Sequence, residues 1–131
     1  MSSVLHSINV SSGGVPKFAR RSAAVRASSV EGDHQRDLRY HGGPTRAVCL
    51  YSLELIQSLR AEGHPIDVGS IGENFTLAGV PWERMVPGAT LEVGAVQRVA
   101  QKVHPGWSRL YARVLREGTV AVGDKVILGV P

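Results

Sequence analysis

Glycine and proline divide this chain into short segments. Fifteen glycines and seven prolines lie among its 131 residues, and the longest apolar stretch between them is Ala47–Tyr51. Short segments bounded by turn-forming residues are typical of small β-barrels. They are far shorter than the roughly 20 apolar residues that cross a bilayer. We therefore expect a mainly β protein with a few helices, forming a single domain over residues 1–131.

The charge balance favours an anionic partner. Fifteen Lys and Arg face eleven Asp and Glu, which gives a formal charge of +4 and a pI near 9.7. Such a bias suits either nucleic acid or a small phosphorylated ligand. Aromatic residues make up only 5% of the chain, too few for a platform on which bases stack. The composition therefore favours a small anion over nucleic acid.

The N-terminus and the cysteine content point to the cytoplasm. The residues from Met1 to His6 do not form a basic region followed by an apolar one, so we expect no secretory signal. The single cysteine, Cys49, excludes an internal disulfide and a multi-cysteine metal site. Cys49 lies among apolar neighbours, where a thiol usually acts as a small buried hydrophobe. We expect a cytoplasmic protein with no membrane association and a structural Cys49.

Hydrophobic periodicity predicts several strands and one clear helix. Ser52 is placed to cap a helix that runs to about Glu62, and Gly63 follows where a C-terminal glycine belongs. Residues 96–103 are typical of the end of a second helix. The strands predicted by alternating or continuously apolar patterns are Val4–Val10, 24–26, 46–51, 75–77, Thr90–Val93, 110–115 and 125–128.

Two polar, glycine-containing segments are candidates for a binding site. In Gly32–Arg46, backbone amides near Gly42 and Gly43 would form an anion-binding nest, and Arg46 would supply a fork for phosphate. The alternative is a turn-rich connector whose charges face water. The histidines of this segment, seven residues apart, match no compact zinc signature, so we predict no metal site. The second candidate is Gly72–Asn74.

Several motifs follow one another in a characteristic order. They are Gly32-Asp33-His34-Gln35, His41-Gly42-Gly43-Pro44, Arg46-Ala47-Val48, Gly72-Glu73-Asn74 and the closing run that includes Gly106-Trp107 and Gly123-Asp124. Together they resemble the MOSC domain, which occurs at the C-terminus of molybdenum cofactor sulfurases and in small stand-alone bacterial proteins. The resemblance covers nearly the whole chain, from Val4 to Leu128.

The resemblance implies a β-barrel of MOSC type that binds the molybdenum cofactor, a molybdenum-pterin with a dithiolene and a phosphate. It implies a molybdenum-cofactor-dependent sulfurtransferase, or an oxidoreductase that reduces N-hydroxylated compounds, with a protein partner as the sulfur or electron donor. The resemblance also implies binding of pyridoxal phosphate, as an association made for the family as a whole. The residues that we expect to bind the cofactor in this chain are Lys17, Asp33, Gln35, His41, Gly42, Gly43, Arg46, Glu73 and Asn74.

These residues have distinct expected roles. Arg46 and the Gly42-Gly43 amides would hold the phosphate. His41, Asp33 and Gln35 would fix the pterin or the loop. Glu73 and Asn74 would line the opposite wall, and Lys17 would add a positive charge to the rim. We therefore expect residues 32–46 and 72–74 to converge on one concave surface.

One departure from the family concerns its loop cysteine, the presumed persulfide carrier or molybdenum ligand. The family has this cysteine after the strand that corresponds to Leu91–Val93, and here Gly94–Val96 contains none. No catalytic residue is therefore assigned. We predict that residues are missing near Gly94–Gln97, so that one pair of adjacent α-carbons between Val93 and Arg98 lies much further apart than about 3.8 Å. The alternative is a non-catalytic module that binds another anionic ligand or a partner protein.

Overall fold

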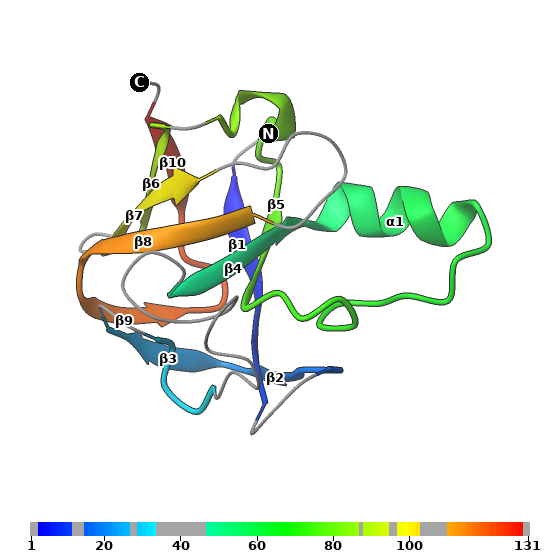
Figure 1. Ribbon diagram of the computed structural model, residues 1–131, viewed down its shortest axis with the longest axis horizontal. Helices are drawn as coiled ribbons and strands as arrows, with labels where there is room; N and C mark the ends of the chain where they lie inside the picture. The colour runs from blue at the N-terminus through cyan, green and yellow to red at the C-terminus, as the bar shows by residue number, and fades with distance from the viewer. Residues whose placement is uncertain are drawn as a thin grey trace.

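The computed structural model describes residues 3–11, 15–26, 29–33, 47–86, 88–94, 97–102 and 110–129. Its fold is mainly β with one α-helix in this part of the chain (Figure 1). In order, the elements are β1 (Val4–Val10), β2 (Phe18–Arg20), β3 (Ser22–Val25), β4 (Val48–Ser52), α1 (Leu53–Ala61), β5 (Phe75–Ala78), the 3-10 helix η1 (Trp82–Arg84), β6 (Thr90–Val93), β7 (Gln97–Lys102), β8 (Leu110–Arg116), β9 (Gly118–Ala121) and β10 (Val126–Gly129).

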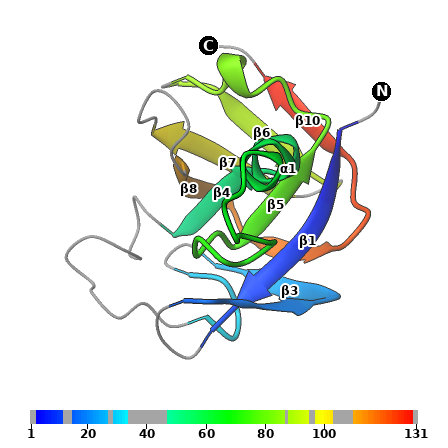
Figure 2. The same cartoon turned by 90° about the vertical axis from the view of Figure 1, so that its right-hand side faces the viewer.

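Eight of the strands form one sheet in the order β10-β6-β7-β8-β4-β5-β1-β2, and β3 pairs with β9 in a second, two-stranded sheet. Neighbouring strands are antiparallel except for β4 and β5, which are parallel. Parallel neighbours need a crossover connection, and α1 lies in the connection between them. Figure 2 shows α1 end-on in front of β4 and β5.

The expected β-barrel is not found, because no sheet in the described part closes on itself. The start of β1 contacts β10 and the residues before it through a bridge between Val4 and Lys125 and through backbone bonds. Val126 N donates to Ser3 O at 2.9 Å, Leu5 N donates to Asp124 O at 2.9 Å, and Gly123 N donates to Leu5 O at 2.8 Å. The same side of β1 pairs with β2 further along, from Ile8 to Val10. Because β2 takes that half of the edge, β1 cannot pair continuously with β10.

Side chains on the two sides of the sheet differ in character. Val48 and Leu50 of β4 point into the hydrophobic core, where they pack with Phe75 and Leu77 of β5. Side chains alternate along a strand, so Cys49 and Tyr51 point to the opposite side, which we call the outer side. Every residue of β4 is nevertheless buried, which means that both sides of this strand are covered.

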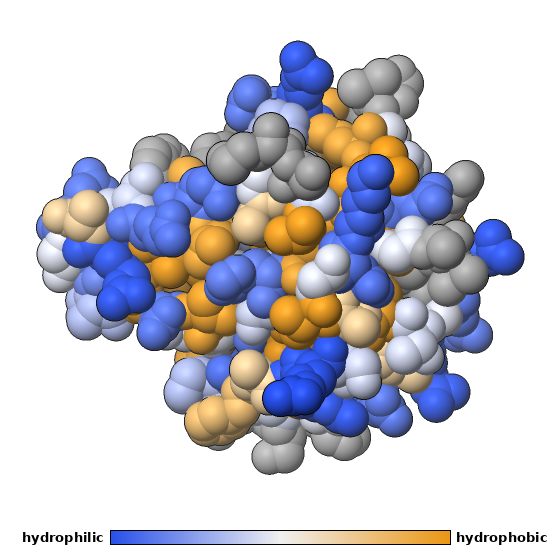
Figure 3. Space-filling model, turned by 180° about the vertical axis from the view of Figure 1, so that it is seen from behind, coloured by the Kyte–Doolittle hydropathy of each residue, from blue (hydrophilic) through white to orange (hydrophobic). Residues whose placement is uncertain are grey.

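The helix α1 has the ends that the sequence predicts. Leu55 N donates to the Ser52 hydroxyl at 3.2 Å, and Gly63 has a φ of +98°. Ile56 is its buried residue, and its exposed side is hydrophilic (Figure 3). None of the helices in the described ranges is long and apolar enough to cross a membrane.

The prediction of a helix over residues 96–103 is wrong, because residues 97–102 form strand β7. In the register Val99 lies opposite Leu91 of β6 and Val114 of β8, so pairing on both sides sets this conformation. Strands β2 and β9 were also not predicted.

The pairing of β6 with β7 is relevant to the prediction that a segment of the chain is missing after Val93. Val93 lies opposite Gln97, so the two strands form a hairpin whose connection is residues 94–96. A three-residue connection is common in hairpins. Residues 95 and 96 lie outside the described residues, but the pairing that flanks them argues against a missing segment in this chain.

Candidate functional site

Four of the predicted site residues meet in the interior of the protein. Lys17, Asp33, Glu73 and Asn74 are all buried, while Gln35, His41, Gly42, Gly43 and Arg46 lie outside the described residues. The four belong to a buried polar cluster on the outer side of β1, β4 and β5. We define the polar cluster as Ser7, Asn9, Lys17, Asp33, Glu73, Asn74 and Thr76.

The side chain of Asn74 lies at the centre of the polar cluster. Its Oδ1 accepts a hydrogen bond from Cys49 N at 2.9 Å. Its Nδ2 donates to Asp33 Oδ2 at 3.0 Å and to the carbonyl oxygen of Asn9 at 3.2 Å. A carboxamide offers one acceptor and two donor hydrogens, and this arrangement uses both groups. An aspartate in the same place would have no donor for Asp33.

These bonds hold both flanks of the polar segment 34–46. Asp33 precedes that segment directly, and Cys49 follows it by three residues. Asn74 bonds to both through one side chain, and its own backbone N donates to Cys49 O at 2.8 Å. Asp33 and Cys49, on either side of the segment, are therefore bonded to a single buried residue.

Lys17 and Asp33 form a buried ion pair. Lys17 Nζ lies 2.5 Å from Asp33 Oδ1, and the two side chains are 4% and 1% exposed. Ser11 N also donates to Asp33 Oδ1, at 2.9 Å. Lys17 was expected at the rim of a pocket, but it lies in the interior, where its charge compensates Asp33. A buried carboxylate needs such compensation to be tolerated.

Glu73 fixes the segment that leads into β5. Its Oε2 accepts bonds from Gly69 N and from the Thr76 hydroxyl, each at 3.0 Å. Its carbonyl oxygen accepts from Asn9 Nδ2 at 3.2 Å. Burial raises the pKa of the Tyr51 hydroxyl above its usual value, and the charge of Glu73 raises it further. Tyr51 therefore stays protonated at neutral pH and cannot act there as a base.

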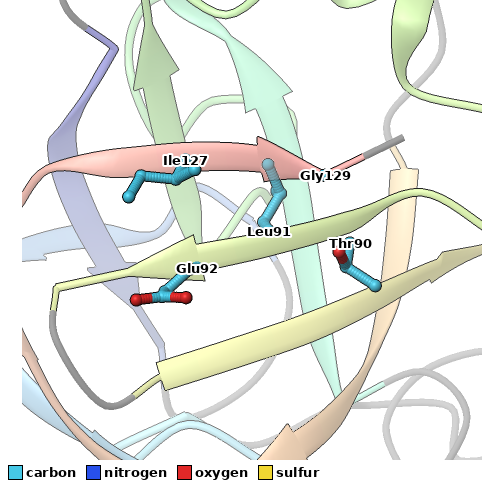
Figure 4. A pocket seen from close by; sticks show the side chains of 5 residues that line it. All are labelled: Thr90, Leu91, Glu92, Ile127 and Gly129. Carbon is cyan, nitrogen blue, oxygen red and sulfur yellow. The ribbon is translucent and has the colours of Figure 1, made fainter. Parts of the chain in front are cut away.

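Of the two segments that we predicted to converge on one concave surface, Asp33 and Asn74 bond to each other in the interior. Residues 34–46 lie outside the described residues, so the predicted concave surface stays a prediction. A surface hollow between β6 and β10 is lined by Thr90, Leu91, Glu92, Ile127 and Gly129 and contains none of the predicted residues (Figure 4). Within the described ranges, no three His, Cys, Asp or Glu residues are grouped to hold a metal ion. The polar cluster thus joins the described residues on either side of segment 34–46.

The sequence did not identify Asn9 and Thr76 as members of the polar cluster, nor Gly69 as a residue that bonds to it. Asn9 donates to both the Thr76 hydroxyl, at 3.1 Å, and the Glu73 carbonyl, and it accepts from the Ser7 hydroxyl at 2.7 Å. One signal was available, because asparagine is depleted in strands and Asn9 lies within a predicted one. Glu73 and Thr76 lie more than 60 residues from Asn9 in the chain, so the sequence alone did not indicate that they are its partners.

Gly69 packs so closely that an added methyl group should be costly. Its φ is +85°, and a Cβ there would clash with the backbone of Lys17. Gly63, with a φ of +98° and open space around it, is the matched control. We expect Gly63→Ala to cost about 1 kcal/mol from backbone strain, and Gly69→Ala to cost about 1–3 kcal/mol more from overpacking. Urea unfolding measures both, and equal losses would show that Gly69 is not packed in this way.

Known proteins place this chain in a family. The family model of the MOSC domain matches residues 37–108, so the chain belongs to the MOSC domain family. A relative in Bacillus subtilis (strain 168), described as uncharacterized protein YflK, is 29% identical over 141 aligned positions that cover 91% of this chain. The chain spans only 64% of the length of that relative.

Solved structures show the same fold at low sequence identity. The YuaD protein of Bacillus subtilis aligns with a TM-score of 0.79 at 14% identity, covering 98% of this chain and 96% of its own. YiiM from Geobacillus stearothermophilus aligns with a TM-score of 0.75 at 22% identity, covering 97% and 75%. YiiM from Escherichia coli aligns with a TM-score of 0.67 at 14% identity, covering 99% and 69%.

Proposed function

We propose that this chain is a binding module for a phosphorylated pterin of the molybdenum-cofactor type, and that the segment 34–46 contacts this ligand. Membership of the MOSC family supports the ligand class. The observation that carries the proposal is that one side chain, Asn74, bonds to both flanks of this segment. A segment with fixed ends loses less conformational freedom on binding.

The residue types of segment 34–46 suit a phosphate. The Gly42-Gly43 pair allows backbone amides to approach an anion closely. The planar guanidinium of Arg46 would donate two parallel hydrogen bonds to phosphate oxygens. In this proposal the polar cluster does not contact the ligand, and its role is to hold the ends of the segment.

The available donors do not fit a thiolate-ligated molybdenum. Cys49 is the single cysteine of the sequence, it is 3% exposed, and its backbone N and O are both bonded to Asn74. The connection between β6 and β7, which would carry the family's cysteine, has none. We therefore derive no step of sulfur transfer or of reduction of N-hydroxylated compounds on this chain. Either activity would need a thiol from a partner.

Replacement of Arg46 by lysine tests the phosphate contact. Lysine keeps the charge but not the two-pronged geometry, so Arg46→Lys should weaken binding of a synthetic pterin phosphate by about 1–3 kcal/mol. Titration calorimetry on both proteins measures this. Arg26→Lys, on an exposed residue after β3, is the control and should bind as the wild type does. Equal affinity for the wild type and Arg46→Lys would mean that Arg46 adds only general charge.

A further inference from the structure

The side chain of Arg20 contacts the residues that lead into segment 34–46. Arg20 is the last residue of β2, where it lies opposite Ile8 of β1. Its Nη1 donates a hydrogen bond to the carbonyl oxygen of Glu31 at 3.2 Å, and its Nη2 lies 3.7 Å from Glu31 Oε1. One guanidinium therefore contacts both the backbone and the side chain of Glu31, two residues before Asp33.

Gly32 leaves room for this guanidinium. Its φ is +83°, in the left-handed region that favours glycine. A Cβ at this position would clash with Arg20 Nη1 and would lie 3.6 Å from Val10 Cγ2. Because glycine has no side chain, the guanidinium packs against the backbone directly before Asp33.

The same residues are also bonded to β3 and to the polar cluster. Glu31 N donates to Ala24 O at 2.8 Å, and Ala24 N donates to Glu31 Oε1 at 3.1 Å. The carboxylate of Asp33 is bonded within the polar cluster. Residues 31–33 are thus held by buried groups at Asp33 and by the exposed side chain of Arg20 at Glu31.

The contact between Arg20 and Glu31 has a small expected effect on stability. The two side chains are 39% and 48% exposed, and ion pairs between exposed groups usually add little to the free energy of unfolding. The contact does restrict the backbone of residues 31 and 32, directly before the candidate ligand-binding segment. When a ligand binds one of several positions of a segment, its affinity falls with the fraction of molecules that hold that position.

We propose that Arg20 is a positioning residue for segment 34–46, and that it acts through Glu31 and Gly32 without contacting the ligand. This inference rests on the proposed function, because it requires that segment 34–46 binds the phosphorylated pterin. A positioning role predicts a lower affinity at unchanged stability. A contribution of general positive charge predicts the same loss of affinity when a neighbouring arginine is removed.

Three variants test this role: Arg20→Met, Arg20→Lys and, as the matched control, Arg21→Met, which removes the same charge at the adjacent exposed residue. Titration calorimetry measures the binding of a synthetic pterin phosphate, and urea unfolding measures stability. We expect Arg20→Met to lose about threefold to tenfold in affinity at an unchanged urea midpoint, and Arg21→Met to stay within about twofold of the wild type. Lysine keeps the charge but not the fork, so the affinity of Arg20→Lys should lie between those of the wild type and Arg20→Met.

Amide hydrogen exchange in the ligand-free protein tests the positioning role without the pterin. Exchange at Glu31 N and Asp33 N should be faster in Arg20→Met than in the wild type, and unchanged in Arg21→Met. Unchanged exchange at both amides in Arg20→Met would overturn the proposal, and so would an unchanged affinity or an equal loss of affinity in Arg21→Met. No binding of pterin phosphate by the wild type would reject the proposed function and the role of Arg20 in it, and the exchange result would still show whether Arg20 holds residues 31–33.

Discussion

Replacing Lys17 by methionine should lower the free energy of unfolding by about 3–5 kcal/mol, because it leaves the Asp33 carboxylate buried without its cation. The effect is large because the two side chains are almost completely buried, with Nζ 2.5 Å from Oδ1. A solvent-exposed pair such as Arg60 and Asp67, 3.6 Å apart, should contribute little. Arg60→Met is therefore the matched control. Urea denaturation of the three proteins measures the difference.

A double variant separates the loss of an ion pair from the loss of packing. Lys17→Met with Asp33→Asn removes both charges and should recover part of the lost stability. Recovery would be incomplete, because an amide has one acceptor oxygen, whereas Asp33 now accepts from Ser11 N at Oδ1 and from Asn74 Nδ2 at Oδ2. A cost below about 1 kcal/mol for Lys17→Met alone would contradict a compensated buried pair.

The second large effect concerns Asn74. Asn74→Asp replaces the donor Nδ2 with an oxygen that faces Asp33 Oδ2 and the Asn9 carbonyl, at 3.0 and 3.2 Å in the wild type. Two hydrogen bonds are lost and two buried carboxylates meet, so we expect a loss of about 3–5 kcal/mol at neutral pH. Asn74→Ala loses these two bonds and the bond from Cys49 N, without the added charge, and should cost about 2–4 kcal/mol.

Amide hydrogen exchange gives a local readout for the Asn74 variants. Cys49 N donates to Asn74 Oδ1, so its protection should fall in Asn74→Ala. Asn74→Asp keeps an acceptor oxygen at that place and should protect the Cys49 amide better, relative to its own global stability. Unchanged exchange at Cys49 in Asn74→Ala would show that the side chain does not hold the flank of segment 34–46.

Local patterns allowed much of the secondary structure to be predicted. The ends of α1 are set by the Ser52 cap and Gly63, which lie close to the helix in sequence. Apolar and polar side chains alternate along Thr90–Val93, and this local pattern was enough to predict β6. Strand β7 was missed because its conformation depends on pairing with β6 and β8 rather than on its own pattern. The closed barrel is not confirmed, and the sharing of one side of β1 between β2 and the region of β10 is a long-range property that local sequence patterns do not show.

Four of the nine predicted site residues lie in the described part of the chain, and their surroundings differ from those we expected. Lys17, Asp33, Glu73 and Asn74 do converge, yet they are buried and bond to one another or to nearby backbone. A sequence shows that a side chain is polar, but burial decides whether it faces a ligand or another side chain. Asn9, which bonds to four other members of the cluster (Ser7, Glu73, Asn74 and Thr76), left only a weak composition signal.

The compound that co-purifies with this protein from its native host tests the proposed function most directly. The measurement is pterin fluorescence, phosphate and molybdenum per chain, in the wild type and in Cys49→Ala. We expect about one phosphorylated pterin per chain in both proteins, because the proposed contacts come from segment 34–46 and not from the buried Cys49. Absence of any pterin, or molybdenum that is bound by the wild type and lost in Cys49→Ala, would contradict a binding module without thiol chemistry.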